Sequence, residues 1–368
     1  MGKTDFMPLI IFSKLSEVNE MIICVPTPIG THFEPDLQYI INSARQISKY
    51  IIEGHIIVLK STTYPGTTEE EFLPILEQNG FKVGRDFFLG YSPEREDPGN
   101  MSYTTKTIPN IARGVTEKCC SIVEALYKQV VDNVFPVSSP RVAEAAKLLE
   151  NIYKAVNIAL VNELKVIFCK MDIDIWEVIE ASKTKPFGFQ TFYPGPGLGV
   201  HCIPIDPFYL TWKAREYEIY TMFIELAEEI NNSMPDYAAF IVVTALNSIG
   251  KSINGAKVLI LGMAYKPDVD DMRESPSLKL MSLLMNYGAK IDYNDPYISS
   301  IPPTRKYRFN MQSVELSLGN LAKYDAVILS TNHSNYDYKM IYDFSQLIID
   351  MKNAFEIKGI RNNKVWKA

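Results

Sequence analysis

Short apolar runs alternate with helical stretches in the first part of the chain, and this alternation limits the possible folds more than any other feature. Residues 21–25, 55–60 and 87–91 are apolar runs with the length of buried strands. Residues 36–52 and 67–79 lie between them and place apolar side chains at helical spacing. This order is typical of a parallel sheet covered by helices. The first part of the chain is therefore expected to form an α/β unit.

The middle of the chain has a different pattern, which predicts helices. Residues 141–170 contain no Gly or Pro and repeat apolar side chains at the helical period, so they predict one long helix. Residues 217–249 are also helical in pattern, with a break expected at Met234-Pro235, where the proline would start a new helix. The long helix suits a connector between domains or the interface of a dimer.

A second α/β unit follows the turn at Asn254-Gly255. Its expected elements are a helix at 277–287 and strands at 257–261, 290–293, 326–330 and near Val365. The Asp295-Pro296 turn follows the second of these strands, at the carboxyl edge where open α/β sheets bind ligands. The expected fold class is therefore α/β, with two Rossmann-like units flanking a helical centre.

Composition and cysteine spacing disfavour several classes of protein. With 368 residues, 47% of them hydrophobic, and a formal charge of −6, the chain reads as a globular protein without the basic surface that nucleic acid requires. Its five cysteines show neither zinc spacing nor a secretory disulfide framework, which indicates reduced thiols in the cytoplasm. No apolar run is long enough to span a bilayer, and no metal site is expected.

The glycine-rich loop 194–202, called the cysteine loop below, ends at Cys202, with His201 before it and Asp206 four residues after it. Alternating Pro and Gly cannot continue a helix or a ladder, so this loop is a turn with bare backbone close to the thiol. A free cysteine taken alone is more often a small buried side chain. A neighbouring histidine and carboxylate favour a nucleophile instead.

Several motifs occur in a fixed order along nearly the whole chain. They are Cys24-Val25-Pro26-Thr27-Pro28, Lys60-Ser61-Thr62, Ser92-Pro93-Glu94-Arg95, Lys147-Leu148-Leu149-Glu150-Asn151, the cysteine loop, and Gly262-Met263-Ala264-Tyr265-Lys266 with Arg273-Glu274-Ser275. This order resembles the nucleotide-sugar 6-dehydrogenases, the family of UDP-glucose, UDP-N-acetylglucosamine and GDP-mannose dehydrogenases. Pro-Gly-Pro-Gly before His-Cys-Ile-Pro, with Ser-Pro-Glu-Arg upstream, looks like the branch that oxidises UDP-N-acetylhexosamines rather than UDP-glucose, with UDP-N-acetylglucosamine as the expected substrate.

The resemblance implies a four-electron oxidation of the sugar C6 hydroxyl to a carboxylate with two NAD⁺. It also implies that Cys202 holds the intermediate aldehyde as a thiohemiacetal and then a thioester, which water hydrolyses. A homodimer, a UDP-sugar substrate and the supply of polysaccharide precursors follow from the same resemblance.

Lys147 and Asn151 are four residues apart, so both project from one face of the long helix. They match the pair that stabilises the oxyanion in the family, whereas a lysine taken alone would be read as a solvated surface group. Asp206 and Glu94 match two carboxylates that orient or activate water, and which of them is the base stays open. Thr62 matches a threonine near the nicotinamide; its simpler reading is a turn hydroxyl.

The remaining site residues are assigned through the resemblance. Lys266 and Arg273 match anchors for substrate and cofactor, with a surface salt bridge to the acidic run 268–274 as the alternative. The expected cofactor-binding residues are Val25, Pro26, Thr27, Ser61, Thr62 and Arg273. The expected substrate-binding residues are Glu94, Arg95, Lys147, Asn151, Gly197, Gly199, His201 and Lys266.

The sequence departs from the family in two places. No Gly-x-Gly-x-x-Gly precedes Met21, so the resemblance implies an N-terminally truncated cofactor domain with weakened NAD affinity. Val200 stands where the family has Gly before His-Cys, which would strain the backbone or obstruct the sugar. The expected domains are a truncated NAD-binding unit, a central helical unit with the dimer interface and catalytic loop, and a UDP-sugar-binding unit, at residues 1–138, 139–252 and 253–368.

Alternative functions remain open at this level. A UDP-sugar-binding or assembly partner without catalysis would keep the helical centre and the second α/β unit. A UDP-glucose 6-dehydrogenase would share the motifs with a different pocket. A thiol redox or acyl-transfer protein is disfavoured, because no resolving cysteine lies nearby.

Overall fold

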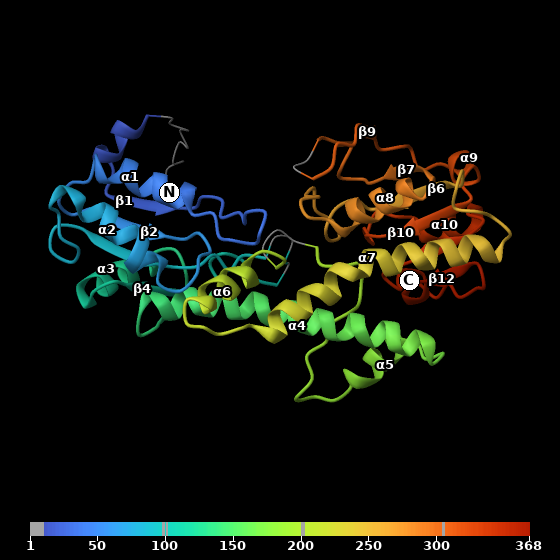
Figure 1. The fold of residues 1–368 in the computed structure, drawn as a ribbon, viewed down its shortest axis with the longest axis horizontal. Helices are drawn as coiled ribbons and strands as arrows, with labels where there is room; N and C mark the ends of the chain where they lie inside the picture. Colours follow the sequence, from blue (N-terminus) through green and yellow to red (C-terminus); the bar gives the residue numbers. More distant parts are fainter. Residues whose placement is uncertain (1–10, 98–99, 101, 200–202, 304–305) are drawn as a thin grey trace. The chain divides into compact units, whose positions relative to one another are not determined.

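The computed structural model describes residues 11–97, 100, 102–199, 203–303 and 306–368. The chain divides into two compact units (Figure 1). The N-terminal unit comprises Met1–Ile152 and Ile205–Thr221, and the C-terminal unit comprises Tyr153–Pro204 and Met222–Ala368. Each unit is built on one five-stranded sheet. The domain boundaries expected from the sequence stay a prediction.

The sheet of the N-terminal unit confirms the α/β class for this half of the chain. Its strands are β1 (Glu20–Ile23), β2 (Ile56–Leu59), β3 (Phe88–Tyr91), β4 (Asn110–Gly114) and β5 (Val134–Pro136). They lie in chain order, with β1, β2 and β3 parallel and β4 antiparallel to β3. Ile57, Leu59 and Leu89 are fully buried in this sheet, as expected for strands covered on both faces.

Helices cover the N-terminal sheet where their apolar faces find partners. They are α1 (Gln38–Ser48), α2 (Leu73–Leu76) and α3 (Glu117–Tyr127), with short 3₁₀ helices at Phe12–Glu17 and Glu77–Asn79 and a π-helical stretch at Thr67–Phe72. The remaining helix of this unit, α6 (Asp206–Arg215), packs against Leu148 of the long central helix. In α1, Ile40, Ala44 and Ile47 form the buried stripe that the helical spacing predicts. Cys119 and Cys120 are buried in α3, so both act as core side chains.

The long central helix is confirmed as α4 (Pro140–Lys170). The predicted break at Met234-Pro235 is wrong, because α7 (Met222–Ser248) continues through the proline. Pro235 and its neighbours Met234 and Ala238 are buried, so tertiary packing maintains the helix where the proline removes one backbone hydrogen bond.

The C-terminal unit contains a fully parallel sheet, drawn in orange and red in Figure 1. Its strands are β6 (Lys257–Leu261), β7 (Lys290–Asn294), β10 (Ala326–Leu329), β11 (Ile348–Asp350) and β12 (Val365–Lys367), and a separate pair is β8 (Ser300–Ile301) with β9 (Met311–Gln312). The strand order is β12-β11-β10-β6-β7, so the direction of winding reverses between β6 and β10. Open α/β sheets bind ligands at the carboxyl ends of such strands.

The remaining helices of the C-terminal unit are α5 (Ile175–Ser182), α8 (Pro276–Asn286), α9 (Leu318–Leu321), α10 (Tyr338–Phe344) and α11 (Ala354–Ile357). The buried side chains of α7 and α8 form one cluster with the inward face of β6. In the described part of the chain, no helix has the length and apolar character needed to cross a bilayer.

Candidate active site

Three parallel strands of the N-terminal unit end at one edge of the sheet, and the loops that follow them are tied together. The Ser61 hydroxyl after β2 accepts a hydrogen bond from the Val25 N–H after β1 at 2.8 Å, and donates to the Val25 carbonyl at 2.8 Å. Lys60 Nζ lies 3.1 Å from Glu94 Oε2 in the loop after β3. The sequence-predicted residues Val25, Ser61 and Glu94 therefore meet at the carboxyl edge.

The carboxyl edge of this sheet leaves surface open on which a dinucleotide would lie. Pro26 is exposed there, while Thr27 and Thr62 are partly exposed. The bonds of Ser61 to Val25 give this surface a defined shape. When bound there, NAD⁺ would supply the hydride acceptor. Cofactor contacts of the individual residues stay predictions.

Glu94 is held as a carboxylate at this edge. Burial opposes its ionisation, but backbone N–H donors and the Lys60 ammonium outweigh that effect, so the pKa of Glu94 lies below its usual value. Its Oε1 accepts from the N–H groups of Arg95 and Glu96, each at 2.8 Å. A carboxylate with so many donors is a weak base, which favours a positioning role for Glu94 over proton removal.

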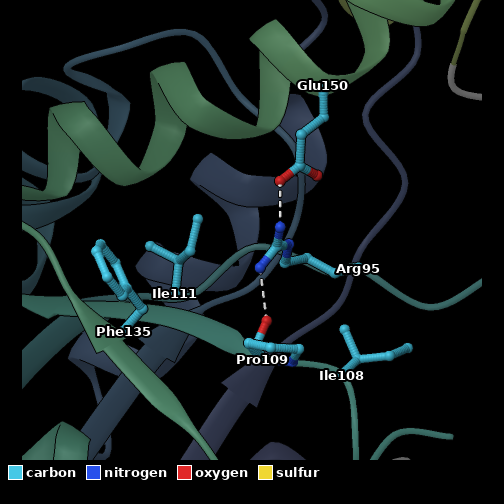
Figure 2. Close-up of a pocket in the computed structure, with 6 residues that line it drawn as sticks. All are labelled: Arg95, Ile108, Pro109, Ile111, Phe135 and Glu150. Carbon is cyan, nitrogen blue, oxygen red and sulfur yellow. Dashed lines mark hydrogen bonds and ion pairs between the residues drawn. The ribbon is translucent and has the colours of Figure 1, made fainter. Parts of the chain in front are cut away.

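Arg95 is bound to the protein itself (Figure 2). Its guanidinium lies 2.7 Å from a carboxylate oxygen of Glu150 on α4, and it donates to the Pro109 carbonyl at 2.6 Å. Ile111 and Phe135 line the same pocket. The observed role of Arg95 is thus to fasten the Ser92–Glu96 loop to α4, and its contact with substrate stays a prediction.

A buried polar cluster on α4 and α6 unites three of the predicted catalytic residues. The Asn151 amide donates to Asp206 Oδ2 at 2.5 Å, and both side chains are buried. Burial raises the pKa of Asp206 to about 7, although the charge of Lys147 and the Asn151 hydrogen bond act against the rise. A carboxyl group that titrates near neutrality can accept or return a proton under working conditions.

Apolar packing holds Asp206 in this position. It is the first residue of α6, and the neighbouring side chains Ile205 and Tyr209 pack against Leu148 of α4 and Tyr64. Leu148 lies between Lys147 and Asn151 in the sequence, so the same turn of α4 supplies the packing and the polar groups. The geometry of the cluster is therefore set by a core contact.

Glu144, which sequence reasoning missed, lies on α4 before Lys147. Its carboxylate is fully buried and accepts from the N–H of Gly66 at 2.6 Å, from the N–H of Thr68 at 2.9 Å, and from the Thr68 hydroxyl at 2.7 Å. These bonds fix the turn after Thr62 to the helix that carries Lys147. Its position three residues before Lys147, which puts both side chains on one helix face, was the signal for such a role.

Replacing Glu144 with alanine is expected to lower the free energy of unfolding by about 3 kcal/mol, because buried donors of Gly66 and Thr68 lose their acceptor. Urea denaturation followed by circular dichroism measures the change. Glu163→Ala, at an exposed position of the same helix, is the control. A loss below about 1 kcal/mol would contradict the anchoring role.

Glu144 also predicts a pH dependence of stability. Burial raises its pKa from 4.5 to about 7 in spite of the Thr68 and Gly66 hydrogen bonds. The folded chain therefore retains a proton that the unfolded chain releases, and the free energy of unfolding falls as pH rises through this window. In Glu144→Gln this contribution is absent, so the slope should be shallower by up to about 1.4 kcal/mol per pH unit. Urea denaturation at pH 5, 6 and 7 measures both slopes. Equal slopes for the parent chain and Glu144→Gln would exclude a raised pKa of Glu144 as the cause.

In the C-terminal unit, buried asparagines hold the start of the cysteine loop. Asn162 on α4 accepts from the Gly195 N–H at 3.0 Å and donates to Asn231 on α7 at 2.9 Å. Asn231 in turn donates to the Ala155 carbonyl at 3.0 Å. Sequence reasoning missed both asparagines. Val200, His201 and Cys202 lie outside the described residues, so their predicted roles rest on the sequence.

Backbone geometry and close packing explain why two positions of this loop, Gly197 and Gly199, are glycines. Gly197 has a φ of +135°, which favours glycine. A Cβ on Gly199 would lie 2.7 Å from the Tyr265 carbonyl oxygen, so no larger residue fits there without a shift. The Lys266 ammonium lies 5.9 Å from the centroid of the Tyr265 ring. The loop 262–268 and the cysteine loop are thus in contact within one unit.

Arg273 forms a surface salt bridge with an acidic neighbour, which was the alternative to ligand binding in the sequence analysis. Its guanidinium binds Asp271, with Nη2 to Oδ2 at 2.8 Å and Nε to Oδ1 at 3.1 Å. The side chain is nevertheless 72% exposed. An exposed ion pair of this kind contributes little to stability. Its contact with the cofactor stays a prediction.

Comparison with known proteins assigns the family. Models of three domains of the UDP-glucose/GDP-mannose dehydrogenase family match the chain: the NAD binding domain at residues 9–131, the central domain at 141–233 and the UDP binding domain at 259–357. Protein CapL of Staphylococcus aureus is 39% identical over 95% of this chain and 81% of its own length. The chain belongs to the UDP-glucose/GDP-mannose dehydrogenase family.

Other members of the UDP-glucose/GDP-mannose dehydrogenase family support the same assignment. UDP-N-acetyl-D-glucosamine 6-dehydrogenase of Pseudomonas aeruginosa is 35% identical over 88% of this chain and 75% of its own. The solved structure of UDP-D-ManNAc dehydrogenase from Pyrococcus horikoshii superposes with a TM-score of 0.85 at 29% identity, covering 97% of this chain and 82% of that one. The resemblance drawn from the motifs, the expected α/β class and NAD as the cofactor are confirmed.

Proposed function

We propose that this chain oxidises the C6 hydroxyl of a UDP-N-acetylhexosamine to the uronic acid with two NAD⁺, through a thiohemiacetal and a thioester on Cys202. The observation that carries the proposal is the cluster of Lys147, Asn151 and Asp206. It combines an ammonium, an amide donor and a carboxyl group whose pKa lies at about 7. These groups match the needs of alcohol oxidation, which must remove a proton and stabilise charge on oxygen.

The first half of the reaction converts the alcohol to an aldehyde. The C6 hydroxyl loses its proton, directly or through water, to a base for which Asp206 is the candidate, and the carbon gives up a hydride to the cofactor. Lys147 and Asn151 would stabilise the negative charge that develops on the oxygen. Asp206 is suited to the proton transfer because its pKa lies at about 7, whereas the pKa of Glu94 is held low.

The second half converts the aldehyde to the acid. The Cys202 thiolate would attack the aldehyde carbon while the aldehyde oxygen takes up a proton, which gives a thiohemiacetal. Loss of that proton to a base and of a hydride to the second NAD⁺ would then give the thioester. Water then cleaves the carbon–sulfur bond, releasing the carboxylate, the thiol and a proton. Glu94 is the candidate for orienting this water. The sequence supplies this part of the proposal, because Cys202 lies outside the described residues.

The substrate we propose is UDP-N-acetylglucosamine. Pro-Gly-Pro-Gly before His-Cys-Ile-Pro supports an N-acetylhexosamine, and one close relative is a UDP-N-acetyl-D-glucosamine 6-dehydrogenase. Other relatives are named UDP-N-acetyl-D-mannosamine dehydrogenases, at 29% identity for that of Methanococcus aeolicus. The glucosamine name thus accompanies the higher identity.

The test is NADH formation at 340 nm with four substrates: UDP-N-acetylglucosamine, UDP-N-acetylmannosamine, UDP-N-acetylgalactosamine and UDP-glucose. The proposal expects the highest kcat/KM for UDP-N-acetylglucosamine. A higher value for UDP-glucose would overturn the proposed substrate class, while NADH from none of the four would overturn the proposed activity. Saturable UDP-sugar binding without NADH would instead identify a binding partner without catalysis.

We also propose that the chain forms a homodimer through α4. Tyr153, Leu160 and Ile167 follow each other at seven-residue intervals and are 44%, 50% and 45% exposed. Side chains at this interval lie on one helix face, and an apolar stripe suits the same face of a second copy. Light scattering coupled to size exclusion should give twice the chain mass, and Leu160→Glu should give the monomer mass.

A further inference from the structure

His333 is a fully buried imidazole at the carboxyl end of β10, and sequence reasoning assigned it no role. Its Nδ1 accepts a hydrogen bond from the Asp268 N–H at 3.0 Å. Its Nε2 lies 3.1 Å from Asp295 Oδ2. Because Nδ1 is the acceptor, the neutral ring carries its proton on Nε2 and donates it to Asp295.

Asp295 carries this connection to the start of the next loop. The side chain follows β7 and is 3% exposed. Its Oδ2 also accepts from the N–H groups of Met263 at 2.7 Å and Ala264 at 3.0 Å, while Oδ1 accepts from Tyr297 and Ile298. A carboxylate with this many donors is fixed in orientation. The sequence predicted a ligand-binding turn at Asp295, whereas the carboxylate itself is committed to the protein.

His333 and Asp295 thereby hold both ends of one loop. Asp295 binds the backbone of Met263 and Ala264 at its start, and His333 binds the backbone of Asp268 at its end. Lys266 lies between these two attachments. The loop follows β6 at the point where the strand order of the sheet reverses, and it lies within the region that matches the UDP binding domain.

We propose that His333, through its bonds to Asp268 and Asp295, is a positioning residue that sets Lys266 for the pyrophosphate of the bound UDP-sugar. This inference rests on the proposed function. A neutral imidazole suits the task because it accepts at one end of a rigid ring and donates at the other. A long, flexible lysine binds an anion more tightly when the backbone that carries it is held in place.

The test measures UDP binding to the full chain by isothermal titration calorimetry. His333→Gln keeps a donor near Asp295 but loses the acceptor for the Asp268 N–H, and is expected to weaken UDP binding about tenfold. His333→Asn keeps an acceptor near the Nδ1 position and should lose less. It also provides a second reading if the glutamine variant does not fold.

The control is His55→Gln in the N-terminal unit. His55 is 1% exposed, and its Nδ1 accepts from the Ile52 N–H at 3.2 Å, so this substitution removes a similar buried contact. It is expected to lower the melting temperature without changing UDP affinity. An equal loss of UDP affinity in His55→Gln and His333→Gln would reduce His333 to a general structural role and overturn the proposal.

A double-mutant cycle with Lys266→Ala separates positioning from general damage. If His333 acts through Lys266, His333→Gln should weaken UDP binding no more than about twofold further in the Lys266→Ala background. Additive losses, or unchanged affinity in His333→Gln, would overturn the inference, and so would a parent chain that does not bind UDP. A parent chain that binds UDP but produces no NADH would overturn the proposed activity and leave this inference standing.

Discussion

Replacing Lys147 with alanine is expected to lower kcat by about 10²–10³-fold, because it removes the charge that stabilises the developing oxyanion. The geometry supports so large an effect. Lys147 acts electrostatically on Asp206, whose carboxyl group is buried and hydrogen-bonded to Asn151. A charge in such surroundings is screened less than a charge on the surface.

The Lys147 variant should also shift the pH profile of the residual activity. The Lys147 charge lowers the pKa of Asp206, so its removal should raise that pKa above about 7 and move the acidic limb of kcat, on which the base loses its proton, to higher pH. Lys170→Ala, at an exposed position on the same helix, is the control. A kcat within threefold of the parent, with an unchanged pH profile, would remove Lys147 from the catalytic cluster.

Replacing Cys202 with alanine is expected to reduce the formation of uronic acid by about 10⁴-fold or more, since the covalent mechanism depends on this nucleophile. Product is measured by chromatography with NADH recorded in parallel. Cys169→Ala, which removes an exposed thiol from α4, should retain the parent rate. Uronic acid produced at the parent rate by the Cys202 variant would exclude the thioester.

The sequence predicts those parts of the fold and site that depend on local patterns. Apolar runs predict β2 and β6, because a buried parallel strand must be apolar on both faces. The spacing of Lys147 and Asn151 predicts their common face because a helix repeats every 3.6 residues. The antiparallel pairing of β4 with β3 has no such local signal, since pairing direction depends on the connection and the rest of the sheet.

The missed residues share one physical property: they are buried polar side chains whose partners lie far away in the sequence. Glu144 binds a turn 76 and 78 positions away, and His333 binds a backbone group 65 positions away. Neither distance leaves a trace in local spacing. The wrong break at Pro235 has the same origin, because the packing that maintains α7 comes from other elements of the C-terminal unit.

The ratio of NADH to uronic acid tests the central claim most directly. The chain is supplied with UDP-N-acetylglucosamine and excess NAD⁺, and both products are quantified after the reaction has gone to completion. The proposed four-electron oxidation predicts two NADH for each UDP-N-acetylglucosaminuronic acid formed. One NADH for each molecule of sugar, with the aldehyde as the final product, would contradict oxidation through a Cys202 thioester.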